Sequence, residues 1–261
     1  MKHHFIFPYF GNKREEVETI YENIKHVLDT VEVIVEPYSG SSSFSYYISS
    51  LFPGRFKYIL NDNNNHLTDL YLIMKNENEF NNLISEMNAL TNNITKSQYL
   101  EYIQENNNYK GYFLKSFYYS IRPGLFPTDN RFKENCFNRC LNSPILNFLR
   151  YENVQICNND ALSLIQSYLP QDNTFLFIDP PYLSVYNGFY NEPNVNIYEF
   201  IYNNPNEFLE SKSRVCFCLE KTWIIDLLFK SFPSIEYHKS YRVTGGRKTI
   251  HKLIVNFQIN S

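Results

Sequence analysis

The segment FLFIDPPY, at residues 175–182, decides the fold class of this chain, because an apolar run in it ends at a carboxylate and two prolines. Its first four residues are large and apolar, which predicts a strand buried on both faces. Proline fixes its own φ, lacks a backbone N–H and holds the preceding residue in extended geometry. Pro180 and Pro181 therefore end the strand and leave Asp179 at its carboxyl end, followed by the ring of Tyr182.

Other short apolar runs alternate with helical patterns along the chain. Apolar residues recur at helical spacing over residues 14–28, 44–51 and 67–74. The alternation predicts an α/β fold with a Rossmann-like, mostly parallel sheet of seven strands, which binds ligands at the carboxyl ends of its strands. Besides the strand at 175–178, strands are expected at residues 31–35, 58–60, 154–157, 215–218 and 253–259, and less strongly at 234–243.

Residues 76–150 interrupt this alternation. They contain helical stretches, an Asn-rich stretch near residues 106–108 and the Pro- and Gly-containing segment 120–127. A long insertion in an α/β protein is usually a substrate-facing subdomain or lid. We therefore expect a catalytic domain formed by residues 1–75 and 151–261, with an inserted helical subdomain over residues 76–150.

The composition argues against several classes of protein. The formal net charge of the 261 residues is −3, so nucleic-acid binding would depend on local patches of cations. No apolar run is long enough to cross a bilayer, and the N-terminal residues lack the layout of a signal peptide. The five cysteines lack a second pair at metal-ligand spacing, so we expect reduced thiols, no metal site and an intracellular protein.

The residues after the strand at 175–178 suit methyl transfer to a nucleobase amine. The lone pair of such an amine is delocalised into the ring, so the nitrogen is a poor nucleophile. Hydrogen bonds from its two N–H groups to Asp179 and to a backbone carbonyl near Pro180 would favour a tetrahedral nitrogen. Tyr182 would stack on the base after it leaves the duplex. The alternative is an ordinary Pro-Pro turn with a capping Asp.

The order of motifs along most of the chain resembles the Dam-like, or D12, class of adenine-specific DNA methyltransferases. The resemblance implies that S-adenosylmethionine is the methyl donor and that Asp179, Pro180, Pro181 and Tyr182 form the catalytic motif. Near the N-terminus, the segment PYFGNK at residues 8–13 resembles the family's aromatic-x-Gly-Gly-Lys motif, with Asn in place of the second Gly. This implies cofactor contacts by Tyr9, Phe10, Gly11 and Lys13.

The segment VEPYSGSSSF at residues 35–44 resembles the family's Glu-Pro-Phe-x-Gly-x-Gly motif. The resemblance implies that backbone at Ser39 and Gly40 approaches the methionine part of the cofactor, with Pro37 and Tyr38 beside it. Glu36 is then the partner of the cofactor's ammonium group. Ser42 stands where the family usually has its second Gly. The alternative is a strand-to-helix turn whose serines cap the helix.

Two acidic residues resemble the family's remaining cofactor contacts. Asp62, with Asn63 beside it, ends the second strand and would accept hydrogen bonds from the ribose hydroxyls, as an acid at similar spacing does in dinucleotide sites. Asp160 follows the strand at 154–157 and would accept from the amino group of the cofactor's adenine, next to Ala161. Helix capping is the alternative for both segments.

Candidate DNA contacts lie in two regions. The insertion occupies the place of the family's target-recognition region, and segment 122–127 matches a family segment there only in part, so no recognition sequence follows. Near the C-terminus, the Gly245-Gly246 pair next to cations is suited to clamping a phosphate backbone or to forming a plain hairpin turn. The candidate phosphate or base contacts, each equally compatible with a solvated surface charge, are Arg122, Arg131, Lys133, Arg139, Arg247 and Lys248.

Three functions remain open from the sequence. The first, favoured by the order of motifs, is site-specific transfer of a methyl group to N6 of adenine in double-stranded DNA. The second is related chemistry on cytosine N4 or on RNA. The third is a relative that binds cofactor or nucleic acid without turnover, since Asn12, Ser42 and Leu219-Glu220 depart from the family's pattern. The resemblance also implies that the protein acts wherever the genomic DNA lies. It leaves open a viral or phage origin of the gene and a cognate restriction endonuclease as a partner.

Overall fold

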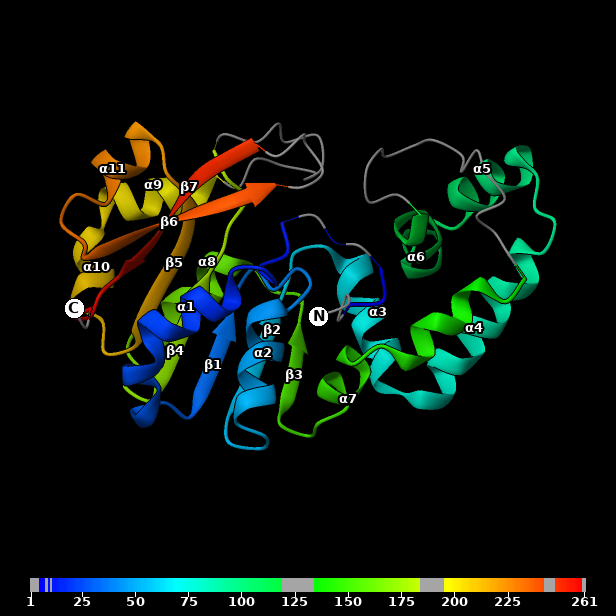
Figure 1. The fold of residues 1–261 in the computed structure, drawn as a ribbon, viewed down its shortest axis with the longest axis horizontal. Coiled ribbons are helices and arrows are strands. Elements are labelled where there is room, and N and C mark those ends of the chain that lie inside the picture. The colour runs from blue at the N-terminus through cyan, green and yellow to red at the C-terminus, as the bar shows by residue number, and fades with distance from the viewer. Residues whose placement is uncertain are drawn as a thin grey trace.

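The computed structural model describes residues 5–7, 9, 11–118, 134–183, 195–241 and 247–259. These residues contain one seven-stranded sheet with the order β3-β2-β1-β4-β5-β7-β6, which confirms the predicted α/β fold (Figure 1). The strands are β1 (Val33–Glu36), β2 (Lys57–Asn61), β3 (Val154–Cys157), β4 (Thr174–Ile178), β5 (Arg214–Glu220), β6 (Ser234–Tyr241) and β7 (Arg247–Val255).

The strand order puts the topological switch point of the sheet, where a ligand-binding crevice is expected, between the carboxyl ends of β1 and β4. β1 pairs in parallel with β2 on one side and with β4 on the other, and β3 and β5 extend the parallel sheet outward. The chain thus builds the sheet in one direction from β1 and then returns to build it in the other. Loops leaving the carboxyl ends of two such strands diverge, and this switch point is where open α/β sheets bind ligands.

Most strands differ from the sequence-based expectation by one or two residues at an end, and the starts of the first and last strands show what sets such boundaries. The last strand was expected at residues 253–259, but β7 begins at Arg247 because it pairs antiparallel with β6 along its length, from Tyr241↔Arg247 to Ser234↔Ile254. The first strand begins at Val33 rather than at residue 31, because the 3₁₀ helix η1 (Lys25–Thr30) occupies the chain just before it. Tertiary pairing and a preceding helix, rather than local apolar content, set these ends.

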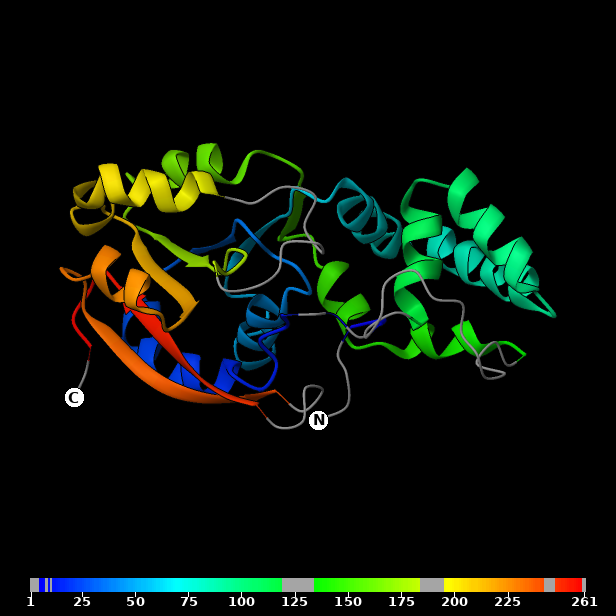
Figure 2. The same ribbon diagram turned by 90° about the horizontal axis from the view of Figure 1, so that it is seen from above.

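Helices cover both faces of the sheet, giving three layers (Figure 2). All five residues of β4 are buried; Phe175 and Phe177 face one apolar core, while Leu176 and Ile178 face the other. The first core includes residues of α1 (Val17–Ile24) and α2 (Ser43–Leu51). The second includes residues of α8 (Ala161–Tyr168), α9 (Val195–Asn203), α10 (Pro205–Leu209) and α11 (Trp223–Leu228).

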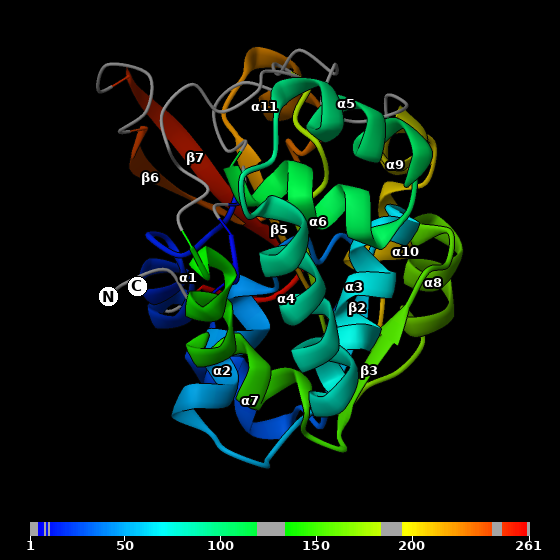
Figure 3. The same cartoon turned by 90° about the vertical axis from the view of Figure 1, so that its right-hand side faces the viewer.

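The residues inserted between β2 and β3 form a helical lobe beyond the β3 edge of the sheet (Figures 1 and 3). Within it, α4 and α6 pack against α3, α5 packs against α6, and η2 packs against α4. The order along the chain is α3 (Asn65–Lys75), α4 (Glu77–Thr91), α5 (Lys96–Glu105), α6 (Tyr109–Tyr118), η2 (Cys136–Asn142) and α7 (Ile145–Leu149).

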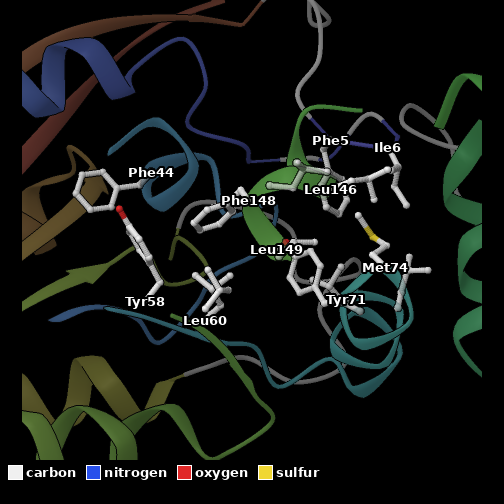
Figure 4. Packing of buried hydrophobic residues seen from close by; sticks show 14 of the residues in the cluster. Phe5, Ile6, Phe44, Tyr58, Leu60, Tyr71, Met74, Leu146, Phe148 and Leu149 are labelled. Carbon is white, nitrogen blue, oxygen red and sulfur yellow. The ribbon is translucent and has the colours of Figure 1, made fainter. Parts of the chain in front are cut away.

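The lobe shares its apolar core with the sheet. α7 packs against α2 and α3, and the ring of Phe148 lies 5.1 Å from that of Tyr58 on β2. Figure 4 shows residues of α7 among side chains from β2, α3 and the N-terminal segment. The boundary of the inserted subdomain at residues 76–150 therefore stays a prediction. No helix in the described part of the chain is long and apolar enough to cross a bilayer.

Candidate active site

Asp179 lies at the carboxyl end of β4 and forms a buried ion pair with Lys13. The ammonium contacts Oδ2 of Asp179, and the two side chains are 5% and 16% exposed for Lys13 and Asp179 respectively. The ammonium also donates to the carbonyl of Gly11 at 3.1 Å and lies 5.2 Å from the centre of the Tyr182 ring. The structure thus brings Lys13 of the N-terminal motif into contact with Asp179 of the predicted catalytic motif.

The turn before Lys13 is stabilised by the residue that departs from the family's pattern. Gly11 adopts the left-handed φ of 72°, so the positive φ falls on the glycine that is present. The Asn12 amide donates to the carbonyl of Tyr9 at 2.6 Å, and its oxygen accepts from the N–H of Arg14 at 3.3 Å. Asn12 therefore holds the turn that presents Lys13 without needing a positive φ of its own.

The electrostatic setting of Asp179 follows from its burial beside a cation. Burial raises the pKa of Asp179 above its ordinary value, and the Lys13 ammonium opposes this rise. Burial is the largest single effect on Lys13 and disfavours its charge, but the surrounding anionic groups, Asp179 first and Glu16 among them, together outweigh burial and raise the pKa of Lys13. Lys13 is consequently a fixed positive charge next to a carboxylate that protonates more readily than a solvated one.

The rest of the catalytic motif is held from two sides. The hydroxyl of Tyr198 on α9 donates to the carbonyl of Pro181 at 3.0 Å, and Pro180 is buried. The ring of Tyr182 meets the ring of His251 on β7 edge to face, with centres 5.4 Å apart. The motif is therefore a rigid corner whose aromatic ring is fixed by a neighbouring strand.

Gly40 makes the tight turn after β1. Its φ is 48°, and a Cβ at this position would lie 3.0 Å from Cε1 of Tyr9. Ser42 is also left-handed, with φ 51°, and makes no side-chain cap to α2; its hydroxyl lies 3.1 Å from that of Tyr71. The alternative of a serine cap is thus wrong for Ser42, and the chain holds a residue other than glycine in the left-handed region at some cost in strain.

Glu36, the last residue of β1, is buried at the start of this turn. Its Oε1 accepts from the backbone N–H of Ser45, in the first turn of α2, at 2.8 Å. Burial raises the pKa of Glu36 to about 7, against the opposing effect of the Ser45 hydrogen bonds. The predicted contacts that follow on the same loop are Pro37, the partly buried Tyr38 and the buried Ser39.

Asp62 ties the end of β2 to the glycine turn. Its Oδ2 accepts from the N–H of Gly40 at 3.0 Å, and its Oδ1 accepts from the N–H of Asn64 at 3.0 Å. Asn63 is exposed next to it. Asn64, rather than Asp62 or Asn63, caps α3, so the capping alternative does not account for Asp62.

Asp160 lies at the N-terminus of α8, where the capping alternative is realised. Its Oδ1 accepts from both the backbone N–H and the hydroxyl of Ser163 at 2.8 Å. Ala161 is buried as the first residue of the helix. The predicted contact of Asp160 with the cofactor's adenine remains a prediction beside this structural role.

Asn61 is a site residue that sequence reasoning did not assign. It is fully buried at the end of β2, and its amide donates to the carbonyls of Pro37 at 3.0 Å and of Asn159 at 3.1 Å. Its oxygen accepts from the N–H of Asn159 at 2.8 Å. Asn61 thus joins the loops after β1, β2 and β3. An Asn that ends the apolar run of the second strand was the signal available in the sequence.

The candidate DNA contacts are distributed differently from the cofactor contacts. Arg139 lies in η2 of the helical lobe, with its guanidinium 4.1 Å from the centre of the Phe117 ring. Arg247 and Lys248 begin β7 after the β6–β7 connection. Side chains at these two positions, like Phe10, Arg122, Arg131, Lys133 and the Gly245-Gly246 pair, lie outside the described residues.

Residues 9–161 match the D12 class N6 adenine-specific DNA methyltransferase family. The chain belongs to this family. It is an adenine-specific DNA methyltransferase, as the resemblance in its motifs implied. The matched region ends before Asp179, so the position of the predicted catalytic motif of this methyltransferase comes from its own structure.

Two solved structures match the chain at low similarity. The delta-N METTL16 MTase domain is 10% identical with a TM-score of 0.41, covering 94% of this chain and 81% of its own. The precorrin-6y C5,15-methyltransferase from Geobacter metallireducens GS-15 is 10% identical with a TM-score of 0.33, covering 88% and 85%. No curated protein matches the chain by sequence.

Proposed function

We propose that the methyltransferase binds S-adenosylmethionine in the crevice between the ends of β1 and β4 and methylates adenine N6 at specific sites in double-stranded DNA. The observation that carries this proposal is the position of Asp179. It sits at the switch point of the sheet, paired with Lys13 of the N-terminal motif and near enough to Glu36 for its charge to contribute to the raised pKa of Glu36.

The residues around the crevice fit S-adenosylmethionine. The left-handed Gly40 has no Cβ, which lets the ring of Tyr9 approach the turn after β1, so two of the predicted cofactor contacts lie side by side. Glu36 and Asp62 are acidic groups on adjacent strand ends, and they suit an ammonium group and a pair of ribose hydroxyls respectively. The cofactor would supply a methyl group on a sulfonium, ready for attack by a nitrogen.

The catalytic corner would hold and activate the target amine. Lys13 engages Oδ2 of Asp179, and we assign Oδ1 to one N–H of the adenine amine, with a backbone carbonyl at Pro180 for the other. Tyr182 would stack on the extruded base. As the carbon–nitrogen bond forms, the carbon–sulfur bond breaks, and the amine then loses one proton. Asp179 is the acceptor nearest to it in this arrangement, so catalysis is positioning with electrostatic support.

DNA would lie over the carboxyl edge of the sheet and reach the helical lobe. The chain carries a net charge of −3, so the phosphate contacts must be local, and the predicted ones are in the lobe and at the β6–β7 connection. We assign target recognition to residues 76–150, which contribute the lobe beside this edge (Figure 1). A cognate restriction endonuclease is part of the same proposal.

The deciding experiment replaces Asp179 with Ala. Calorimetry should show that Asp179→Ala binds S-adenosylmethionine about as well as the wild type, because Asp179 contacts the amine and not the cofactor. Transfer of a labelled methyl group to adenine-containing duplexes should be lost. Asp172→Ala, on the exposed loop before the same strand, is the control and should leave both measurements unchanged. Turnover by Asp179→Ala would remove this residue from the mechanism, and a wild type that binds without transfer would support an inactive relative.

A further inference from the structure

A second buried polar cluster lies behind Lys13, centred on Glu16, which is 3% exposed. Oε2 of Glu16 accepts from the hydroxyl of Tyr237 at 2.6 Å and lies 2.9 Å from Nδ1 of the fully buried His251. Oε1 pairs with the ammonium of Lys239. Tyr237 also contacts Sγ of Cys218 at 3.2 Å. The cluster joins the N-terminal segment to β5, β6 and β7.

The cluster reaches the catalytic corner by two routes. Along the chain, the N–H of Glu16 donates to the carbonyl of Lys13 at 2.8 Å, so the two residues share one tight turn. Through space, the ring of His251 meets Glu16 at Nδ1 and packs edge to face on Tyr182. Displacing Glu16 would therefore disturb both the cation that pairs with Asp179 and the ring expected to stack on the base.

A metal ion is a weaker explanation of this cluster. Ligand atoms of Glu16, Cys218 and His251 do lie within 4.8 Å of one another. However, Oε1 of Glu16 already pairs with Lys239, and the ammonium of Lys13 is close enough to affect Glu16 electrostatically. A divalent cation would add two positive charges beside these two. Burial also raises the pKa of Cys218 to about 12, which keeps the thiol protonated and a poor ligand.

Stability alone is also a weak reason for such a cluster. Removing carboxylates and ammonium groups from water costs free energy that their mutual attraction often fails to recover. Buried charges that persist next to a reaction site commonly hold other groups in place. Asp179 and Lys13 provide one such pair here, and Glu16 and Lys239 provide a second directly behind it.

We propose that Glu16 is a positioning residue of the methyltransferase, which fixes Lys13 against Asp179 and, through His251, the ring of Tyr182. It acts on the methyl-transfer step and leaves the binding of cofactor and DNA unaffected. This inference rests on the proposed role of Asp179. Lys239 and His251, on the two strands of the β6–β7 hairpin, hold the Glu16 carboxylate in place.

Glu16→Gln tests this role, because it keeps the shape of the side chain and removes its charge. The single-turnover rate should fall roughly tenfold to a hundredfold, the scale expected for a small misplacement of reacting groups. Affinities for S-adenosylmethionine and duplex DNA should stay at wild-type values. A loss confined to affinity, with the transfer rate unchanged, would overturn the inference.

The pH profile separates positioning from a merely structural role. The charge of Glu16 raises the pKa of Asp179, so the acid limb of the transfer rate should move to lower pH in Glu16→Gln. An acid limb that stays in place would contradict electrostatic coupling between the two residues. The other charged or titratable groups that influence this site are Lys13, Glu36, Lys239, Tyr182, Tyr198, Tyr237, Cys216, Cys218 and His251.

A double variant tests whether slow transfer in Glu16→Gln comes from unfolding rather than from lost positioning. Glu16→Gln with Lys239→Met removes both charges of the buried pair, so it avoids leaving one ammonium buried alone, and transfer should remain slow. The matched control is Glu236→Gln with Lys221→Met, a solvent-accessible pair at 2.6 Å that also involves β6, and its transfer rate should be unchanged. A wild-type rate in the folded Glu16 double variant, or stoichiometric metal in the purified protein, would overturn the inference. Turnover by Asp179→Ala would instead overturn the proposed function.

Discussion

Individual carboxylates at this site accept hydrogen bonds from the backbone, and we also propose them as contacts of the cofactor. Asp62 accepts from two backbone N–H groups in two different loops, and Glu36 accepts from the first turn of a helix. A carboxylate has about four acceptor positions, so such bonds leave capacity for a ligand. The backbone bonds also fix the direction in which each carboxylate faces the crevice.

Asp62→Ala should weaken the binding of S-adenosylmethionine by about 1.5–3 kcal/mol, the range for hydrogen bonds to charged groups. The loss has two sources, the ribose contacts that we propose and the N–H of Gly40, which would lose its acceptor. Calorimetric titration measures the change, with Asp172→Ala as the control. An unchanged affinity would show that Asp62 does not contact the ribose.

We predict that cofactor binding depends on pH through Glu36, the proposed partner of the cofactor's ammonium group. Burial raises its pKa to about 7 in the folded protein, and only the ionised carboxylate pairs with the cofactor's ammonium. Binding below pH 7 must therefore displace a proton, and affinity should fall as the pH drops through that value and level off above it. Dissociation constants measured on both sides of pH 7 test this. In Glu36→Gln the affinity should be lower, and the part of its pH dependence centred near 7 should disappear.

A polar residue at the start of a helix can cap the helix, contact a ligand or do both, and the sequence alone does not separate these roles. Asp160 and Thr222 both cap helices, with side-chain oxygens accepting from the backbone N–H of the third helical residue. A polar residue before a helix is expected for such a cap whether or not it also touches a ligand. The element therefore explains why Asp160 is there, while its ligand contact needs a separate test.

Asp160→Ala and Thr222→Ala should each lower the free energy of unfolding by about 1 kcal/mol, the usual effect of losing a cap. Only Asp160→Ala should also weaken cofactor binding, if its carboxylate accepts from the cofactor's adenine. Chemical denaturation and calorimetry measure the two effects separately. Equal cofactor affinity in both variants would reduce Asp160 to a helix cap.

The whole molecule has a core that crosses from the sheet into the helical lobe. Phe113 of α6 is fully buried, 5.4 Å from the ring of Phe137 in η2 and 6.4 Å from that of Phe7. These residues belong to the same cluster as Phe175 and Phe177 of β4. The lobe and the sheet should therefore unfold together.

Phe113→Ala should lower the free energy of unfolding by about 3–5 kcal/mol, the usual cost of emptying a buried Phe site. Because the core is continuous, we expect one calorimetric transition that moves as a whole to lower temperature. Tyr202→Ala, at a site 75% exposed, should leave it in place. Two separated transitions, with only one affected, would establish the lobe as an independent domain.

The sequence by itself determined those features of the fold and the site that arise between residues close together in the chain. Apolar runs predicted all seven strands, and the two prolines located Asp179 at a strand end, because backbone restriction by proline acts between adjacent residues. The family resemblance singled out Glu36 at the end of β1, Gly40 in the turn after it and Asp62 after β2, and the matched region confirmed the family.

Only the tertiary structure decided which distant groups meet. Lys13 pairs with Asp179, and Glu16 meets Lys239 and His251, across separations that no local pattern encodes. These contacts arise because the sheet order places the strand ends side by side and the β6–β7 hairpin folds over the N-terminal segment. Burial then shifts the pKa values of these groups. Burial is a property of the packed molecule rather than of any stretch of its sequence.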